Sequence, residues 1–248
     1  MKYRKLLAVG DSHGHYSQLK EAVERSGFDP TQDFMVFLGD YIDRGQEPLK
    51  CLDYVRQWKE NYPDRVVVLK GNHEDMMDEY FLTHNIASDI SDFMSDWMYN
   101  GGETTFKALS KYDMETRKSY LEFIRSLPTK HVMPFHDDNG NNGNIIFCHA
   151  GINPLKPLDK QSDFDLLWIR EQFLNHYSGN DIVVVGHTMV QSLGFEPYPI
   201  IYGTSGNIIM CDTGSYLAGG HVSCVDVLAG EVFQSQEIKS DDCWYFGL

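Results

Sequence analysis

Four apolar runs that lead through a glycine into Asp, Asn or His place the tightest limits on how this 248-residue chain can fold. The runs and the polar residues that follow them are Leu6–Val9 with Asp11, Phe34–Leu38 with Asp40, Val66–Leu69 with Asn72, and Ile182–Val185 with His187. Each run has the length of a buried strand, and a glycine beyond it indicates a turn. The first three runs alternate with helical segments, which predicts parallel strands joined by crossover helices.

Two helices are predicted between these first three strands. Ser17 is a candidate N-cap for a helix over Gln18–Arg25, and Gly27 is suited to end it. The second helix is predicted over Glu47–Asn61, where apolar residues recur every three positions.

The chain changes character after the third strand. Residues 74–127 are rich in Met and aromatic side chains and are predicted to form a helical insertion, broken by the "NGGETT" stretch at 100–105. Further strands are then expected at His131–Phe135, Asn144–Cys148, Ile208–Cys211, Val222–Leu228 and Val232–Gln236. We therefore predict an α/β fold of two packed sheets with helices outside, formed by residues 1–248 as a single domain.

Composition limits the classes of partner. Lys and Arg number 21 against 36 Asp and Glu, a formal net charge of −15, which disfavours binding to nucleic acid or to an anionic membrane. No apolar run approaches the length of a membrane span, and Leu6–Val9 is too short for a signal-peptide core. The five cysteines are odd in number and contain no Cys-x-x-Cys, which indicates reduced thiols and a cytoplasmic protein.

The polar residues at the predicted strand ends have the chemistry of metal ligands. They are Asp11, His13, Asp40, Asn72, His149 and His187. Imidazole suits zinc, iron, nickel or copper, whereas carboxylate and amide oxygens also admit manganese or magnesium. Six ligands exceed one tetrahedral site. They fit two ions about 3.5–4 Å apart that share a bridging carboxylate.

The motifs "GDSHGH", "GDYIDRG", "GNHE", "HAG" and "GHT", in this order, resemble the phosphoprotein phosphatase family of metallophosphoesterases. The resemblance is greatest to the small bacterial and phage serine/threonine protein phosphatases, and it extends from Asp11 to about Gly214. It implies a four-layer αββα sandwich. Five ordered motifs carry the resemblance, whereas "GHT" alone would be uninformative.

The resemblance also implies roles for individual residues. Asp11 and His13 would bind one divalent metal ion, Asp40 would bridge, and Asn72, His149 and His187 would bind the other. Manganese is expected, with iron, zinc or nickel as alternatives.

Four further residues receive roles from the same resemblance. Arg44 and Arg170 would hold the substrate phosphate, since a planar guanidinium matches two phosphate oxygens. His73 would be the general acid, with Asp43 orienting its ring.

Structural roles compete with several of these assignments. Asp40 and Asp43 are also common in turns as local caps. The "WIREQF" stretch is compatible with an amphipathic helix that leaves Arg170 in solvent. His73 is compatible with a surface position at a helix start. Tyr216, in "CDTGSY", is either a substrate contact or a buried aromatic residue.

The remaining candidates are interpreted as structural. Cys148 and Cys211 are expected to fill the core rather than act as nucleophiles. His15, His84, His131, His136, His176 and His221 are expected to be structural or surface residues.

The predicted activity is hydrolysis of phosphoserine or phosphothreonine, with phosphotyrosine as a further substrate. A hydroxide bridging the two metals would attack phosphorus directly, without a covalent intermediate. One alternative is a symmetrical diadenosine-tetraphosphate hydrolase, although such enzymes commonly have "GNHD" followed by Leu where this chain has "GNHEDMMDEY". A second is a non-catalytic phosphate-binding module, which loss of a ligand or of the acid would mark. A phosphoprotein or phosphopeptide partner is expected, and the sequence gives no oligomeric state.

Overall fold

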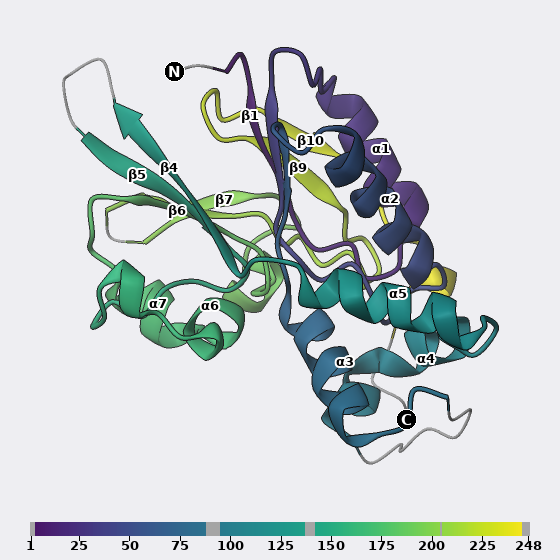
Figure 1. The fold of residues 1–248 in the computed structure, drawn as a ribbon. Coiled ribbons are helices and arrows are strands. Elements are labelled where there is room, and N and C mark those ends of the chain that lie inside the picture. The colour runs from purple at the N-terminus through teal and green to yellow at the C-terminus, as the bar shows by residue number, and fades with distance from the viewer. Residues whose placement is uncertain (1–2, 88–94, 137–141, 204, 245–248) are drawn as a thin grey trace.

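Two five-stranded mixed sheets form the centre of the protein (Figure 1). The structure is a computed structural model that describes residues 3–87, 95–136, 142–203 and 205–244. The first sheet contains, in spatial order, β10 (Val232–Gln234), β9 (Ser223–Asp226), β1 (Leu6–Val9), β2 (Phe34–Phe37) and β3 (Val66–Val68). The second contains β4 (Lys130–His136), β5 (Asn142–Cys148), β6 (Ile182–Val185), β8 (Ile208–Met210) and β7 (Ile200–Tyr202).

The parallel strands predicted from the sequence lie at the middle of each sheet. β1, β2 and β3 are mutually parallel, as are β5, β6 and β8. The antiparallel strands β9 and β10 form the predicted hairpin. Because the parallel strands of each sheet run in the same direction, the loops that follow them emerge at a common edge, where ligands commonly gather in α/β proteins.

Alternating residues of β1 show how the layers are built. Leu6 and Ala8 pack into a core between the sheets, against residues such as Phe147 and Val184 of the second sheet. Leu7 and Val9 point the other way, into a core formed with the outer helices. Burial on both faces explains why this strand is a continuous apolar run.

Helices cover both outer faces. The first sheet is covered by α1 (Tyr16–Ser26) and α2 (Pro48–Asn61), and the second by α6 (Asp163–Trp168) and α7 (Glu171–His176) (Figure 1). The predicted αββα arrangement is therefore confirmed. None of the helices in the described ranges has the length and apolar character needed to span a bilayer.

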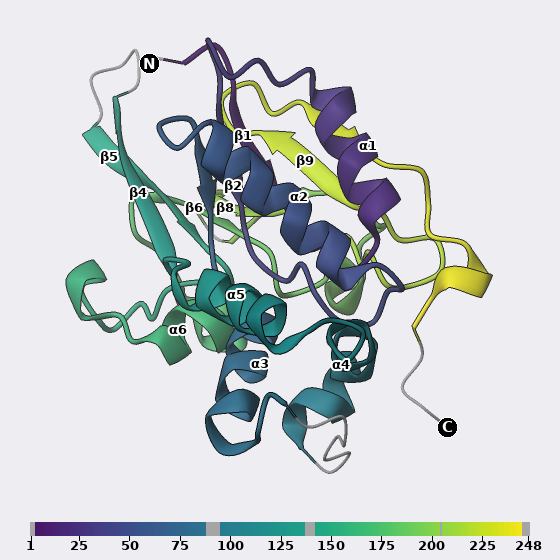
Figure 2. The ribbon, with the colours of Figure 1, turned by 45° about the vertical axis from the view of Figure 1, so that its right-hand side comes forward.

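Three more helices lie together beyond the strand ends, between β3 and β4 in the chain. They are α3 (Asn72–Thr83), α4 (Glu103–Leu109) and α5 (Met114–Arg125), with a π-helical turn at Met98–Gly102 (Figure 2). They occupy the predicted insertion, and α4 begins directly after Gly102 as expected. Phe93 and Met94 of the predicted insertion, and residues 137–141 between β4 and β5, lie outside the described residues.

Helix α1 and strand β7 differ from the sequence prediction. Helix α1 begins at Tyr16 rather than Gln18, and Ser17 is not its N-cap. Its start is set by the preceding loop, in which Gly14 donates a backbone hydrogen bond to Tyr41 and His15 donates one to Ser12. Strand β7 was not predicted, because its three residues form too short an apolar run to be distinguished from a loop.

Candidate active site

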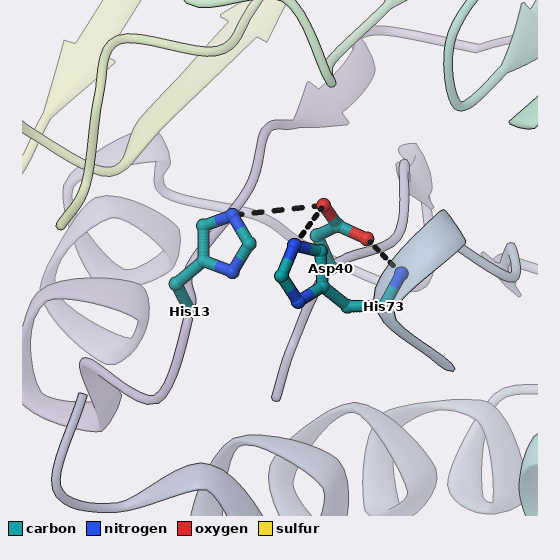
Figure 3. Close-up of side chains that lie close together, drawn as sticks. All are labelled: His13, Asp40 and His73. Atoms are coloured by element: carbon teal, nitrogen blue, oxygen red, sulfur yellow. Dashed lines mark hydrogen bonds and ion pairs between the residues drawn. The ribbon is translucent and has the colours of Figure 1, made fainter. Parts of the chain in front are cut away.

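Asp40, in the loop after β2, lies close to three histidines, of which Figure 3 shows His13 and His73. Its Oδ2 atom is 3.6 Å from His13 Nε2, 3.9 Å from His73 Nε2 and 3.4 Å from His149 Nε2. The backbone N–H of His73 donates to Asp40 Oδ1 at 3.0 Å. All four side chains are buried, so the carboxylate is fixed at the centre of the group.

A second point of convergence is the Asn72 side chain at the start of α3. Its Oδ1 atom is 2.8 Å from His149 Nε2 and 2.9 Å from His187 Nδ1. The backbone N–H of His187 lies 3.0 Å from Asp11 Oδ2 and donates to that carboxylate. The six predicted ligand residues thus come from loops of both sheets and lie together.

Two of the glycines in the strand-end pattern are required by close approach. A Cβ atom at Gly71 would lie 2.2 Å from Asp40 Oδ1, and one at Gly186 would lie 2.0 Å from Asp11 Oδ1. No side chain fits at either position. Gly71 and Gly186 therefore make room for the carboxylates of Asp40 and Asp11 in neighbouring loops.

The orientation of two imidazoles suits them to bind metal ions. The Nδ1–H groups of His13 and His149 donate to the backbone carbonyls of Ile42 and Leu38, which fixes each ring and turns its Nε2 toward the region of Asp40. In the neutral form of each ring, this Nε2 is the nitrogen that could bind a cation.

In the described chain, candidate metal-ligand atoms form two groups. Within each group, the atoms lie within 4.8 Å of one another. One contains His13, Asp40 and His73, and the other contains Asp40, His149 and His187. Asp40 is common to both, which fits a residue shared by two ions. Neither group contains Asp11, whereas the first contains His73, which the sequence resemblance assigns to proton transfer.

Burial disfavours the ionised form of the carboxylates in this site. Burial, together with Asp212 and Asp40, raises the pKa of Asp11 well above its usual range. Burial also opposes ionisation of Asp40, but the neighbouring His149 and His73 hold its pKa well below its usual range. Bound cations would stabilise the ionised forms of all these carboxylates. Asp212 follows β8 in the same pattern as the predicted ligands, but the sequence analysis did not include it.

Two of the imidazoles are held in the neutral form. Burial, reinforced by the charge of Arg44, lowers the pKa of His13 well below its usual range. Burial and the nearby His149 do the same to the pKa of His187. Neutral imidazole is the form that binds a metal ion.

His73 and Asp43 form a buried pair beside this group. His73 Nδ1 donates to Asp43 Oδ2 at 2.7 Å. Trp97 and Thr105, both from the helical insertion, also donate to the Asp43 carboxylate. These two contacts were not predicted from the sequence. Trp97 is one of many aromatic residues in a segment whose composition is typical of a hydrophobic core.

Arg44 lies over the same site and is surrounded by aromatic rings. Its Nη1 and Nη2 groups donate to His13 Nε2 at 2.7 Å and to His73 Nε2 at 3.0 Å. The guanidinium carbon lies 3.8 Å from the ring centre of Tyr216 and 5.4 Å from that of Trp244, which are cation–π distances. Tyr216 is therefore a buried aromatic residue that contacts Arg44. His13 Nε2 can accept from Arg44 or bind a metal ion, but not both.

Arg170 lies at a break between two helices. The alternative of one amphipathic helix through "WIREQF" is excluded, because α6 ends at Trp168 and α7 begins only at Glu171. The exposed side chain of Arg170 reaches the loop after β6, where its Nη1 donates to the His187 carbonyl at 3.1 Å and to Thr188 Oγ1 at 2.9 Å. Arg170 is thereby attached to the loop that carries a predicted metal ligand.

The two strand cysteines are buried and poorly suited to nucleophilic chemistry. Burial raises the pKa of Cys148 to about 12, and that of Cys211 also lies well above its usual range. Cys51, Cys148, Cys211 and Cys224 are all buried and form no disulfide.

Glu74 organises the loop that carries Asp40, a role that the sequence analysis did not assign. Its Oε2 accepts from the backbone N–H groups of Gly71 and Asp40, and its Oε1 from those of Tyr41 and Ile42. Burial and the charge of Asp40 raise the pKa of Glu74 to about 7.

Glu74→Gln is expected to destabilise the fold. The substitution turns one acceptor oxygen into a donor and leaves two buried N–H groups unpaired, at roughly 1–3 kcal/mol each. Urea unfolding of chelator-treated protein should show a loss of about 2–6 kcal/mol. The exposed Glu79 of the same helix supplies a control, since Glu79→Gln should change stability by less than about 0.5 kcal/mol. Equal unfolding midpoints for the two variants would contradict this role of Glu74.

Comparison with known proteins identifies the class to which this fold and site belong. The calcineurin-like phosphoesterase family matches residues 4–222. The chain belongs to this family of metal-dependent hydrolases, which confirms the resemblance seen in the sequence motifs.

Individual relatives agree with this placement. The chain is 31% identical to serine/threonine-protein phosphatase 2 of Salmonella typhimurium over 229 residues, covering 88% of this chain and 90% of that protein. The crystal structure of a candidate diadenosine tetraphosphatase superposes with a TM-score of 0.62 at 16% identity, covering 93% of this chain and 92% of that one. A Saccharomyces cerevisiae serine/threonine phosphatase superposes with a TM-score of 0.60 at 15% identity, covering 97% and 82%. At these identities the two structures establish a shared fold.

Proposed function

We propose that this protein is a phosphomonoesterase that hydrolyses phosphoserine and phosphothreonine in proteins, using two divalent metal ions. The observation that carries the proposal is the position of Asp40, which is shared by two groups of metal-ligand atoms beside the His73–Asp43 pair. The bacterial relative named as a serine/threonine-protein phosphatase, aligned over most of both chains, supports this substrate class.

In this proposal, Asp11, His13 and Asp40 hold one ion, and Asp40, Asn72, His149 and His187 hold the other. Manganese fits the mixed set of oxygen and nitrogen ligands. Divalent ions bound there would lower the pKa of coordinated water and stabilise charge on the phosphate oxygens. We also propose that the enzyme acts in the cytoplasm, as the four buried cysteines that form no disulfide, Cys51, Cys148, Cys211 and Cys224, suggest.

The guanidinium of Arg44 binds the substrate phosphate. A phosphate dianion is a stronger acceptor than a neutral imidazole nitrogen, since both partners of the hydrogen bond are then charged. Transfer of the Arg44 hydrogen bonds to phosphate would free His73 Nε2, which now accepts from Arg44 Nη2. Substrate binding would therefore prepare the acid for its role.

His73 supplies the proton for the leaving group. In the reaction, a water oxygen forms the new bond to phosphorus and releases its proton to solvent, and the bond from phosphorus to the serine or threonine oxygen breaks. Once Arg44 no longer donates to it, His73 Nε2 takes up a proton from solvent and gives it to the departing oxygen, while Nδ1–H remains bonded to Asp43.

Arg170 is the second phosphate ligand in this proposal. Within the described residues, both of its hydrogen bonds use Nη1, so Nη2 and Nε of the exposed guanidinium can face a ligand. Arg170→Ala should raise KM or lower kcat for monoesters by about 10- to 100-fold, because a charge-assisted hydrogen bond contributes about 1.5–3 kcal/mol. Metal content and unfolding should be unchanged. Arg25→Ala, which removes an exposed arginine of α1, is the control. Unchanged kcat and KM would show that Arg170 has only a structural role.

The substrate class is tested by comparing a phosphopeptide with a dinucleoside tetraphosphate, with and without manganese. Two arginines around a terminal phosphate should favour the monoester dianion. Much faster turnover of the tetraphosphate would replace the proposed activity with that of a diadenosine-tetraphosphate hydrolase. Binding without turnover of either substrate would indicate a non-catalytic module.

A further inference from the structure

The backbone N–H groups of the turn that carries Asp40 and Arg44 are bound by the helical segment that follows β3. Glu74 accepts from the first three N–H groups of the turn, at residues 40–42. The N–H of Asp43 donates to Thr105 Oγ1 at 3.0 Å, and the N–H of Arg44 donates to the Gly101 carbonyl at 3.1 Å. Five consecutive backbone donors are therefore bound by α3, the π-helical turn and α4.

These bonds oppose backbone strain. Asp40, Asp43 and Arg44 have φ values of 55°, 71° and 67°, in the left-handed region that non-glycine residues rarely adopt. Such a conformation costs roughly 1–3 kcal/mol per residue and persists only where the surroundings determine it. For Asp43 and Arg44, the bonds to Thr105 and Gly101 provide that constraint.

The Asp43 side chain is fixed as firmly as its backbone. Its Oδ1 accepts from Thr105 Oγ1 at 2.5 Å, and its Oδ2 accepts from Trp97 Nε1 at 2.9 Å and from His73 Nδ1 at 2.7 Å. Asp43 and Thr105 are fully buried and Trp97 is 1% exposed. The Thr105 hydroxyl bonds both the N–H and the carboxylate of the same residue, so the carboxylate cannot rotate without breaking a bond to the insertion.

We propose that Trp97 and Thr105 are positioning residues for the proton donor, and that the helical insertion serves the reaction through them. They aim Asp43 Oδ2 at His73 Nδ1, which in turn aims His73 Nε2 at the leaving oxygen. This inference rests on the proposed role of His73 as the general acid. Neither Trp97 nor Thr105 contacts Asp40 or the other predicted ligands in the described hydrogen bonds, so their effect should be separable from metal binding.

The test is Thr105→Val in the full-length, manganese-loaded enzyme. Valine has nearly the shape of threonine but can neither accept from Asp43 N–H nor donate to its carboxylate. The kcat for a phosphoserine peptide should fall by roughly 10- to 100-fold, the usual effect of removing a group that orients a site residue. An aryl phosphate, whose leaving group needs little protonation, should lose much less. Thr105→Ser should restore activity, because it keeps the hydroxyl.

Controls separate positioning from general destabilisation. Thr83→Val removes a threonine hydroxyl of α3 whose hydrogen bonds to described residues are local, and it should leave both substrates unaffected. Trp97→Phe provides a second variant if Thr105→Val folds poorly, and the same preferential loss on the alkyl substrate is expected. In a His73→Asn background, Thr105→Val should cost nothing further, since it would act only through His73.

Proportional losses on aryl and alkyl substrates, or an undiminished loss in the His73→Asn background, would overturn the positioning role. If His73→Asn lowered hydrolysis of both substrates equally, the assignment of His73 as the general acid would be rejected, and this inference would be rejected with it. If His73→Asn discriminated while Thr105→Val and Trp97→Phe did not, the inference alone would fail.

Discussion

Asp40→Asn is expected to abolish most of the activity, with the largest effect of any single change among the proposed metal ligands. Asp40 Oδ2 lies within 4 Å of His13, His73 and His149, so its charge serves both groups of ligand atoms. A neutral amide is a poor bridge between two dications. Metal ions contribute several kcal/mol of transition-state stabilisation, so a loss on the order of 10³-fold in kcat/KM is expected.

Metal content should change in parallel with activity. A chelator should abolish hydrolysis by the unmodified protein, and manganese should restore it, whereas Asp40→Asn should bind less metal and recover little. Asp53→Asn is the matched control, because Asp53 is a hydrogen-bonded carboxylate of α2 whose partner is Tyr120 rather than a site residue. Full activity of the Asp40→Asn variant, or of metal-free protein, would contradict the two-metal proposal.

The sequence predicted which polar residues lie close together because they follow buried parallel strands. Such strands appear as continuous apolar runs, so their boundaries were predicted to within about a residue for β1, β2, β3 and β6. Parallel pairing then brings their exits to one edge. The proximity of Asp11 and Asp40 follows from these two facts without any knowledge of side-chain geometry, whereas the proximity of His187 also requires the packing of the second sheet against the first.

Contacts between distant segments could not be predicted in the same way. Trp97 and Asp43 are 54 residues apart and share a hydrogen bond, yet a tryptophan in an aromatic-rich helical segment carries no sequence signal of that contact. The role of Glu74 could not be predicted either. An acidic residue in the first turn of a helix is common, because it stabilises the helix electrostatically. Its contact with three successive N–H groups depends on how α3 meets the loop after β2.

The C-terminal segment shows the same limit. Trp244 lies beyond the part of the chain that the phosphoesterase family matches, yet its N–H donates to the Tyr216 carbonyl and its ring lies near Arg44. Because this segment returns to the site only in three dimensions, neither motif nor spacing could have associated it with Arg44.

His73→Asn is expected to lower hydrolysis of phosphoserine peptides far more than hydrolysis of an aryl phosphate. The imidazole is buried, donates to Asp43 at 2.7 Å and presents Nε2 to the region around Arg44. General acid catalysis typically contributes about 10²–10⁴-fold, but only where the leaving group needs the proton. A phenolate has a conjugate acid with a pKa of about 10 and departs with little help. A serine or threonine alkoxide is far more basic and requires protonation in the transition state.

The measurement is kcat/KM for a phosphoserine peptide and for an aryl phosphate, at matched metal occupancy, in the unmodified enzyme, His73→Asn and Asp43→Asn. The alkyl substrate should lose about 10²–10⁴-fold in His73→Asn, and the aryl substrate much less. Asp43→Asn should show the same selectivity with a smaller loss, because the ring remains while its charged partner is removed. Metal content distinguishes a general acid from a metal ligand. This measurement is needed because His73 Nε2 is within 4 Å of Asp40 and belongs to one group of ligand atoms. Equal losses on both substrates, accompanied by loss of metal, would make His73 a metal ligand rather than the acid, and Asp43 would then orient a ligand instead of a proton donor.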